Sequence, residues 1–258
     1  MKKALILTSV AFVLLLAVVA AGLNVIFTIT YIEASFSTFS AQGEEDAYSL
    51  KAELDEFVGD SMTFLKLGSV KAKVEKYPCF RVESVTKKFP KTVQICVSER
   101  RELFAYQTQE GKYAMIDTEG VCIRMSEQNV SRTGGENILL KNFELETEVG
   151  SKIKGTYLDA LFDAFSGFED CMTDARANVR EVTLAYNGGA GSLEFNVFNI
   201  EMQEGVIVEM YDPLTRAAEK AKVAMEKYSG LGDIQKMYGT ITVTESRTGE
   251  LNVVYQER

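Results

Sequence analysis

The chain has 258 residues, of which 46% are hydrophobic and 25% are charged, and these are the proportions of a folded globular protein with a sizeable core. Its formal net charge of −9 argues against nucleic acid or anionic lipid as the main partner. Histidine is absent, so histidine general bases, catalytic triads and histidine-containing metal sites are excluded.

The N-terminal part contains a long uncharged stretch. Residues 4–29 carry no charge, and Lys2 and Lys3 precede them. A helix needs about 20 apolar residues to cross a bilayer, so the stretch predicts a transmembrane helix over 4–29. The positive-inside rule then makes residues 1–3 a cytoplasmic tip and exports the rest of the chain. A cleaved signal peptide is the alternative, with small residues at 19–21 as the cleavage site, but the apolar run continues past that site.

Residues 30–98 are predicted to form a module with the order strand, helix, helix, strand, strand. Apolar residues recur at helical spacing after Ser49, which is the expected N-cap of the first helix. The second helix is expected between Ser69 and Pro78, because proline stops a helix. Two strands follow, joined by a turn at Phe89-Pro90.

Residues 99–258 are predicted to form a mixed β-domain with two helices. One helix is expected from Thr156 and the other from Asp212-Pro213, where aspartate and proline stand in the preferred order for a helix start. The charges of the second helix, Lys220 among them, are expected on its solvated face.

The last part of the β-domain is predicted to consist of paired strands. A glycine-rich turn at 187–191 separates two alternating segments and lacks the Gly-Lys-Ser/Thr of a phosphate loop. Strands at 239–244 and 251–255 close the chain, with a turn between them.

The four cysteines are widely spaced. They form no Cys-x-x-Cys pair, so neither a zinc knuckle nor a redox site is indicated. We expect most of them to be small buried apolar residues, and three full pairings stay open if the domain is exported. They are Cys79, Cys96, Cys122 and Cys171.

One segment carries a resemblance to a known family. A proline at 78 is followed by a strand, a basic-Phe-Pro turn at 88–90, a second strand and then Glu99-Arg100. This pattern, together with Ile-Asp-x-x-Gly at 116–120, resembles the signature of the FtsQ/DivIB family of bacterial cell-division proteins. The resemblance implies an α+β fold with one N-terminal transmembrane helix, a POTRA module (β-α-α-β-β) over 30–98 and a β-domain over 99–258.

The resemblance also implies a function. Members of the family are non-enzymatic divisome scaffolds in the cell membrane at the division septum, and they help assemble or regulate septal peptidoglycan synthesis outside the cytoplasm. Their partners are FtsB/DivIC, which docks at the C-terminal edge of the β-domain, and FtsL, which is bound to that partner. No catalytic residue, metal, cofactor, small-molecule substrate or nucleic acid is implied. Carried over by position, the partner-binding strand is Leu251, Asn252, Val253, Val254 and Tyr255.

Two alternatives stay open. One is a membrane-anchored envelope scaffold outside division, with the same fold and different partners. The fold alone does not distinguish it from a division scaffold. A carboxylate-based envelope hydrolase needs two carboxylates roughly 5–10 Å apart across a cleft. Acidic runs at 44–46 and 144–148 supply carboxylates, but such runs are typical of solvated loops.

Overall fold

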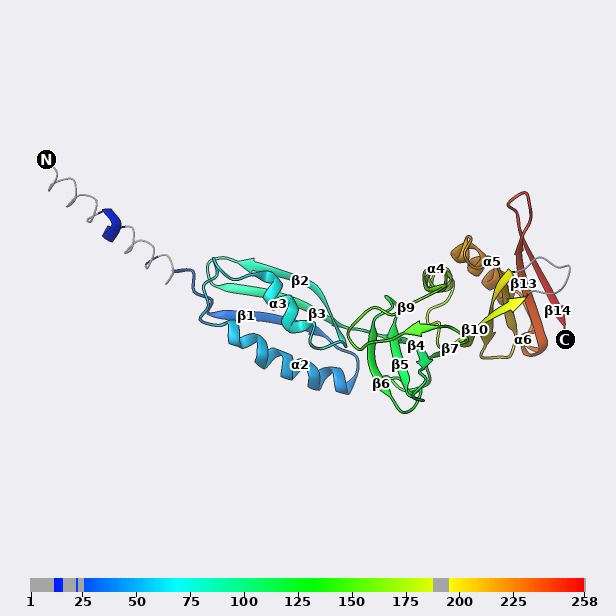
Figure 1. Cartoon of the computed structure of the whole chain (residues 1–258), viewed down its shortest axis with the longest axis horizontal. Helices are drawn as coiled ribbons and strands as arrows, with labels where there is room; N and C mark the ends of the chain where they lie inside the picture. The colour runs from blue at the N-terminus through cyan, green and yellow to red at the C-terminus, as the bar shows by residue number, and fades with distance from the viewer. Residues whose placement is uncertain (1–11, 16–21, 23–25, 188–194, 258) are drawn as a thin grey trace. The chain divides into compact units, whose positions relative to one another are not determined.

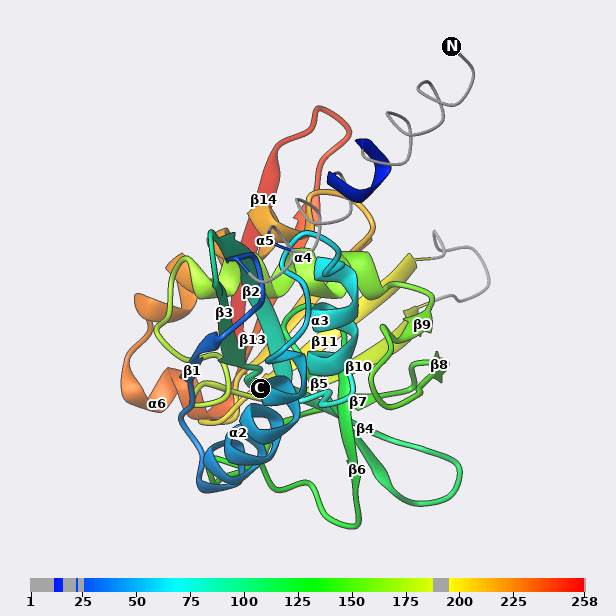
Figure 2. The same ribbon diagram turned by 90° about the vertical axis from the view of Figure 1, so that its left-hand side faces the viewer.

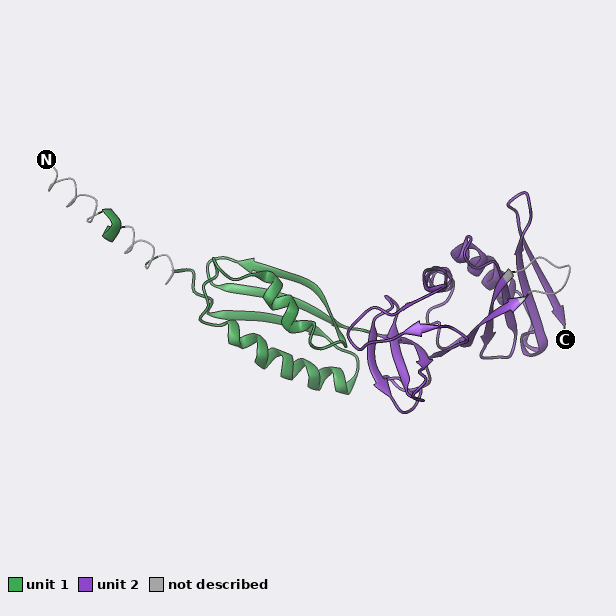
Figure 3. Ribbon diagram, in the orientation of Figure 1, with its two compact units in different colours: residues 1–100 green, residues 101–258 purple. Residues whose placement is uncertain are grey.

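The computed structural model describes residues 12–15, 22, 26–187 and 195–257 (Figure 1). The chain divides into two compact units, residues 1–100 and 101–258 (Figure 3). The division lies close to the boundary that the strand and helix pattern predicts between residues 98 and 99.

The first unit is a three-stranded sheet with helices on one face (Figure 2). The strand order is β1-β3-β2, in which β1 runs parallel to β3 and β2 antiparallel to it. Alternate side chains of β3 point into the core, and Val93, Ile95 and Val97 are buried there. The elements are β1 (Tyr31–Ser37), α2 (Ala41–Leu54), the 3-10 helix η1 (Asp55–Phe57), α3 (Leu67–Val74), β2 (Phe80–Lys88) and β3 (Thr92–Glu99).

Helix α2 begins before the predicted N-cap at Ser49. Its N-cap is Ser40, whose Oγ accepts a hydrogen bond from the N–H of Gly43 at 2.9 Å. The apolar spacing misplaced the start because the first turn of the helix is polar, and its buried face continues there through Gly43 and Ala47. The start predicted for the second helix at Ser69 is also wrong, because α3 begins at Leu67.

Glu99 at the end of β3 holds the start of α2 in place. Its buried carboxylate accepts hydrogen bonds from the N–H groups of Phe39 at 2.8 Å and Ser40 at 3.1 Å, and from the Ser40 hydroxyl. A Cβ atom at residue 43 would lie 2.2 Å from Glu99 Oε2, so only glycine fits there. Glu99 thus has a structural role in this chain.

The second unit is built on one large sheet of nine strands in the order β14-β13-β12-β11-β10-β7-β4-β5-β6, with a separate β8-β9 ribbon. Its strands are β4 (Glu102–Gln107), β5 (Tyr113–Asp117), β6 (Cys122–Ser126), β7 (Ile138–Lys141), β8 (Leu145–Glu146), β9 (Lys154–Gly155), β10 (Val179–Asn187), β11 (Phe195–Met202), β12 (Ile207–Tyr211), β13 (Gly239–Glu245) and β14 (Leu251–Glu257). Its helices are α4 (Leu158–Glu169), α5 (Ala217–Ser229) and α6 (Asp233–Tyr238).

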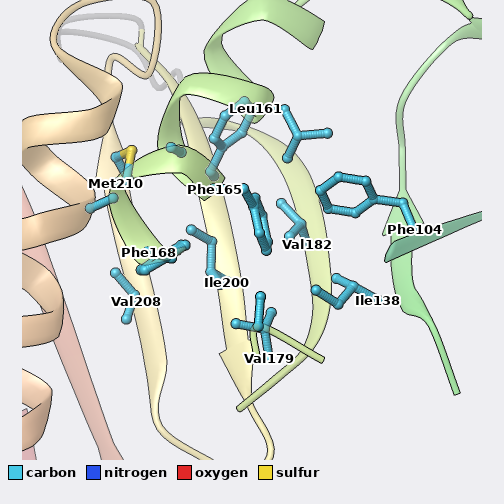
Figure 4. Close-up of a cluster of buried hydrophobic side chains, with 14 of the residues drawn as sticks. Phe104, Ile138, Leu161, Phe165, Phe168, Val179, Val182, Ile200, Val208 and Met210 are labelled. Atoms are coloured by element: carbon cyan, nitrogen blue, oxygen red, sulfur yellow. The ribbon is translucent and has the colours of Figure 1, made fainter. Parts of the chain in front are cut away.

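The core of the second unit lies between this sheet and α4 and α5 (Figure 4). Phe165 and Phe168 of α4 are buried, and the ring of Phe165 meets that of Phe104 edge to face, with centroids 4.7 Å apart. Helices α4 and α5 pack closely at Gly167, where a Cβ atom would lie 2.3 Å from the carbonyl oxygen of Ala218. The predicted glycine-rich turn lies largely in residues 188–194, outside the described residues.

The predicted fold class is wrong in two respects. No helix in the part of the chain that the structure describes is long and apolar enough to cross a membrane, which overturns the predicted transmembrane helix. Much of 4–29 lies outside the described residues. The second unit has three described helices rather than two, because α6 is too short to show apolar periodicity. The fold is mixed α/β, with six helices described beyond residue 30, one of them the 3-10 helix, and large β-sheets.

Candidate functional site

Strand β14 is the last strand of the large sheet. It pairs antiparallel with β13 along its whole length, and no described residue pairs with its other side. The five predicted site residues are consecutive in this strand, so the structure brings all of them to one sheet edge. An edge strand leaves a row of backbone donors and acceptors without ladder partners.

The opposite edge of the sheet is less open. Strand β6 is shorter than β14, and its first residue, Cys122, is already bonded to the backbone of a neighbouring loop. Its N–H donates to the carbonyl of Ser151 at 3.0 Å, and its carbonyl accepts from the N–H of Gly150 at 2.8 Å. β14 therefore offers the longer free edge.

The backbone groups of β14 alternate in direction. The N–H of Ser246 donates to the carbonyl of Glu250 at 2.8 Å, and the pairing continues from there without a shift in register. Hydrogen-bonded pairs alternate with non-bonded pairs in an antiparallel ladder. The even-numbered residues of β14, such as Val254, thus point their N–H and C=O toward β13, whereas the odd-numbered ones, such as Val253, point them outward.

The side chains of β14 alternate as well. Leu251, Val253 and Tyr255 are half-buried, and the last two pack against the core of the second unit. Asn252 and Val254 are exposed, Val254 by 60%. One face of the strand is therefore fixed by packing, while the other face and the outer backbone stay accessible to solvent.

Tyr255 holds the C-terminal half of β14 against α6 and β13. Its hydroxyl donates to the carbonyl of Gln235 at 3.0 Å. Its ring covers Gly239, where a Cβ atom would lie 2.0 Å from Cε2 of the ring. Partial burial raises the pKa of Tyr255, with a smaller contribution from Glu257. The glycine and the tyrosine together fix the position of this part of the edge.

Charged residues hold the closed end of the β13–β14 hairpin. Arg216 Nη1 donates to the carbonyl of Gly249 at 2.6 Å and lies 3.4 Å from Oε1 of Glu245. Lys220 Nζ lies 3.9 Å from Oε2 of the same carboxylate. The loop before α5 thereby fixes the turn from which β14 starts.

Lys220 is buried, contrary to the solvated position predicted for it. Its Nζ donates to the carbonyls of Tyr211 at 3.0 Å and Asp212 at 2.7 Å, and to Oγ1 of Thr215 at 2.9 Å. Burial lowers the pKa of Lys220. All of its donors are used inside the chain, which makes it a structural lysine rather than a nucleophile or base.

The same loop explains why α5 starts later than predicted. Asp212 and Arg216 have φ values of 47° and 51°, so the chain turns twice before the helix begins at Ala217. The carbonyls exposed by this loop are the acceptors of Lys220, and no local sequence rule reveals such an arrangement. The helical spacing from Ala217 through Lys220 to Ala224 is the only sequence signal that places the lysine on the buried face.

Two carboxylates at one cavity lack the buried setting that a glycosidase gives its general acid. The cavity, of about 780 Å³, is lined by Glu119 and Asp159 among others, and both of these side chains are exposed. A glycosidase keeps its general acid in an apolar, buried environment, and neither of these two side chains has one. Buried Glu102 is instead paired with Arg124, with Oε1 2.7 Å from Nε.

The described residues contain no group of three or more cysteine, aspartate or glutamate side chains that could hold a metal ion. The four cysteines are free thiols, and only two of them, Cys79 and Cys122, are buried. Burial raises the pKa of the Cys122 thiol to about 11.

Comparison with protein-family models and with curated proteins gives no match for this chain. The strongest functional feature is therefore the geometry of the sheet edge at β14.

Proposed function

We propose that the chain is a non-enzymatic scaffold that binds another protein by adding a partner strand to β14. The observation that carries the proposal is the free outer side of this strand at the end of the nine-stranded sheet. Backbone groups of the partner would pair with the outward N–H and C=O groups of β14 and supply affinity. The exposed side chains of Asn252 and Val254 would supply specificity.

The nature of the partner rests on the resemblance of residues 78–120 to the FtsQ/DivIB signature. On that basis the partner is an FtsB/DivIC-like division protein, accompanied by an FtsL-like one. The scaffold would then help to assemble or regulate septal peptidoglycan synthesis on the outer side of the cell membrane. The β-α-α-β-β order of the first unit agrees with the POTRA module of this family.

The test uses two substitutions of Val253. Val253→Pro removes one outward N–H and leaves the inward ladder to β13 intact. Val253→Thr keeps the N–H and the branched shape, so it serves as the matched control. We expect the proline variant to lose capture of the purified FtsB/DivIC-like protein, and the threonine variant to retain it. If the proline variant is folded by circular dichroism and still binds as the wild type does, the docking site lies elsewhere.

A separate observation distinguishes a division scaffold from an envelope scaffold outside division. A fluorescently tagged chain should gather in a band at the division site of dividing cells. A uniform signal around the cell would contradict the division role and leave strand addition at β14 untouched.

A further inference from the structure

The first unit has a free sheet edge of its own. Strand β1 pairs only with β3 among the described strands. The N–H of Tyr31 points to the carbonyl of Lys91 beside β3. Because the direction alternates along the strand, the backbone groups of Ile32, Ala34 and Phe36 point away from β3. None of these three has a backbone bond to another described segment outside the sheet.

A groove of about 350 Å³ lies between this edge and α2. Phe36 of β1 lines it, and four side chains of α2 line its other wall. The three largest of the α2 side chains there are Glu44, Tyr48 and Lys51, beside the small Ala47. These three lie on one face of the helix because their spacing is four and then three residues. Tyr48 is 80% exposed, which is unusual for a large aromatic side chain beside a groove.

Two side chains of opposite charge line the groove. Neither Glu44 nor Lys51 forms an ion pair with any residue that the structure describes. Glu44 lies in the first turn of α2 and Lys51 in the last turn, on either side of Tyr48. Helix α2 runs back along β1, because β1 ends at Ser37 and the helix begins only a few residues later.

This arrangement is complementary to itself. When two β1 edges pair antiparallel about Ala34, each α2 lies antiparallel to the other, and Glu44 of each copy faces Lys51 of the other. Opposite ends of the two helix dipoles then lie together, which favours the same pairing. Glu33 lies opposite Ser35 across the strands, so no like charges meet. A two-fold interface needs this kind of self-complementary surface.

We propose that two copies of this chain associate through β1 and α2 of the first unit. The two sheets join edge to edge, and the groove is filled by Tyr48 and Phe36 of the other copy. This interface is on a different unit from β14, so it neither requires nor excludes the partner strand proposed there.

Sedimentation velocity of the purified full chain tests the proposal by charge reversal. Glu44→Lys and Lys51→Glu should each weaken the dimer by about tenfold, because two attractive contacts in each dimer become repulsive. An equimolar mixture of the two variants should restore the dimer, since both contacts of the mixed pair join opposite charges. The double variant should restore it as well. Glu45→Lys, on the same helix but outside the groove, is the matched control and should leave the dimer unchanged.

Three results would overturn the proposal. One is a wild-type chain that stays monomeric throughout the micromolar range. Another is a dimer that both charge reversals leave unchanged, and the third is a mixture of the two variants that associates no better than either variant alone. A dimer that survives Val253→Pro, and a partner complex that survives Glu44→Lys, would show that the two interfaces are independent.

Discussion

Gly239 decides where the C-terminal half of β14 lies. The Tyr255 ring occupies the space that a side chain at residue 239 would need, with Cε2 2.0 Å from the ideal Cβ position. Gly239→Ala should therefore displace the tyrosine and destabilise the second unit by about 1–3 kcal/mol, as overpacking usually does. Urea unfolding followed by circular dichroism measures this loss.

Gly232 provides the matched control for that substitution. It lies in the same region, and the nearest atom to an added Cβ is Oε1 of Gln235 at 3.8 Å. Gly232 is the N-cap of α6, where alanine is less favourable than glycine, so Gly232→Ala should lower the free energy of unfolding by less than Gly239→Ala does, at most about 1 kcal/mol. Equal effects of the two alanines would show that the contact between Gly239 and Tyr255 does not fix the strand.

Lys220 gives a second prediction at the level of one residue. Lys220→Met leaves the buried carbonyls of Tyr211 and Asp212 without their donor, which should cost about 2–4 kcal/mol in the free energy of unfolding. Lys222→Met, on the exposed side of the same helix, should cost far less, because its ion pair with Asp170 is exposed to solvent. Similar losses for the two variants would contradict the structural role of Lys220.

The same lysine predicts a pH dependence. Burial lowers the pKa of Lys220 in the folded chain below the ordinary value of 10.5. Between the lowered pKa and 10.5 the unfolded chain binds more protons, so stability should rise with pH in that window relative to Lys220→Met. Denaturant titrations of the wild type and of Lys220→Met at pH 8 and pH 10 test this direction. If the wild type's advantage in the free energy of unfolding is smaller at pH 10 than at pH 8, the prediction is contradicted.

At the level of elements, the strands were predicted better than the helix starts. Alternating residues at 239–244 and 251–255 predict the last two strands, which the structure extends only slightly, to β13 and β14. The start of α2 was missed because Ser40 and Glu99 act together across the unit, and Glu99 is far from the helix in sequence. The position of β14 at the sheet edge also depends on strand pairing between segments far apart in the chain. Its neighbour β13 pairs in parallel with β12, and α5 and α6 lie between these two strands in the sequence.

The start of α2 can be tested through Glu99. Glu99→Gln replaces a buried acceptor-only carboxylate with an amide that has one acceptor oxygen. It should lower the stability of the first unit by about 1–3 kcal/mol, because backbone N–H groups at the helix start lose an ionic acceptor. Glu45→Gln on the exposed face of α2 is the control. If the two variants unfold at the same denaturant concentration, the Glu99 contact does not stabilise the start of the helix.

At the scale of the whole chain, the two compact units assign the two proposed interfaces to different parts of the molecule. The fragment 101–258 contains the whole large sheet and its described helices, so it should fold alone and capture the FtsB/DivIC-like protein as the full chain does. The fragment lacks β1 and α2 and should therefore be monomeric in sedimentation. A folded fragment without binding would place the docking site outside the second unit.

The order of elements in the first unit followed from the sequence, because each helix and strand there has its own local pattern. The strand order of the nine-stranded sheet did not follow from the sequence. It depends on parallel pairings, such as that of β4 with β7, which join segments far apart in the chain. The candidate site residues came from a resemblance, and the outward direction of Val253 depended on the hairpin register that the Ser246–Glu250 pair sets.

Amide hydrogen exchange along β14, with and without the FtsB/DivIC-like protein, tests the central claim most directly. In the free chain, the N–H groups of Asn252 and Val254 should be protected by β13, while those of Val253 and Tyr255 should exchange fast. Addition of the partner should slow exchange at Val253 and Tyr255 and leave the other two largely as they were. Protection of Val253 and Tyr255 in the free chain, or no change when the partner binds, would contradict strand addition at β14.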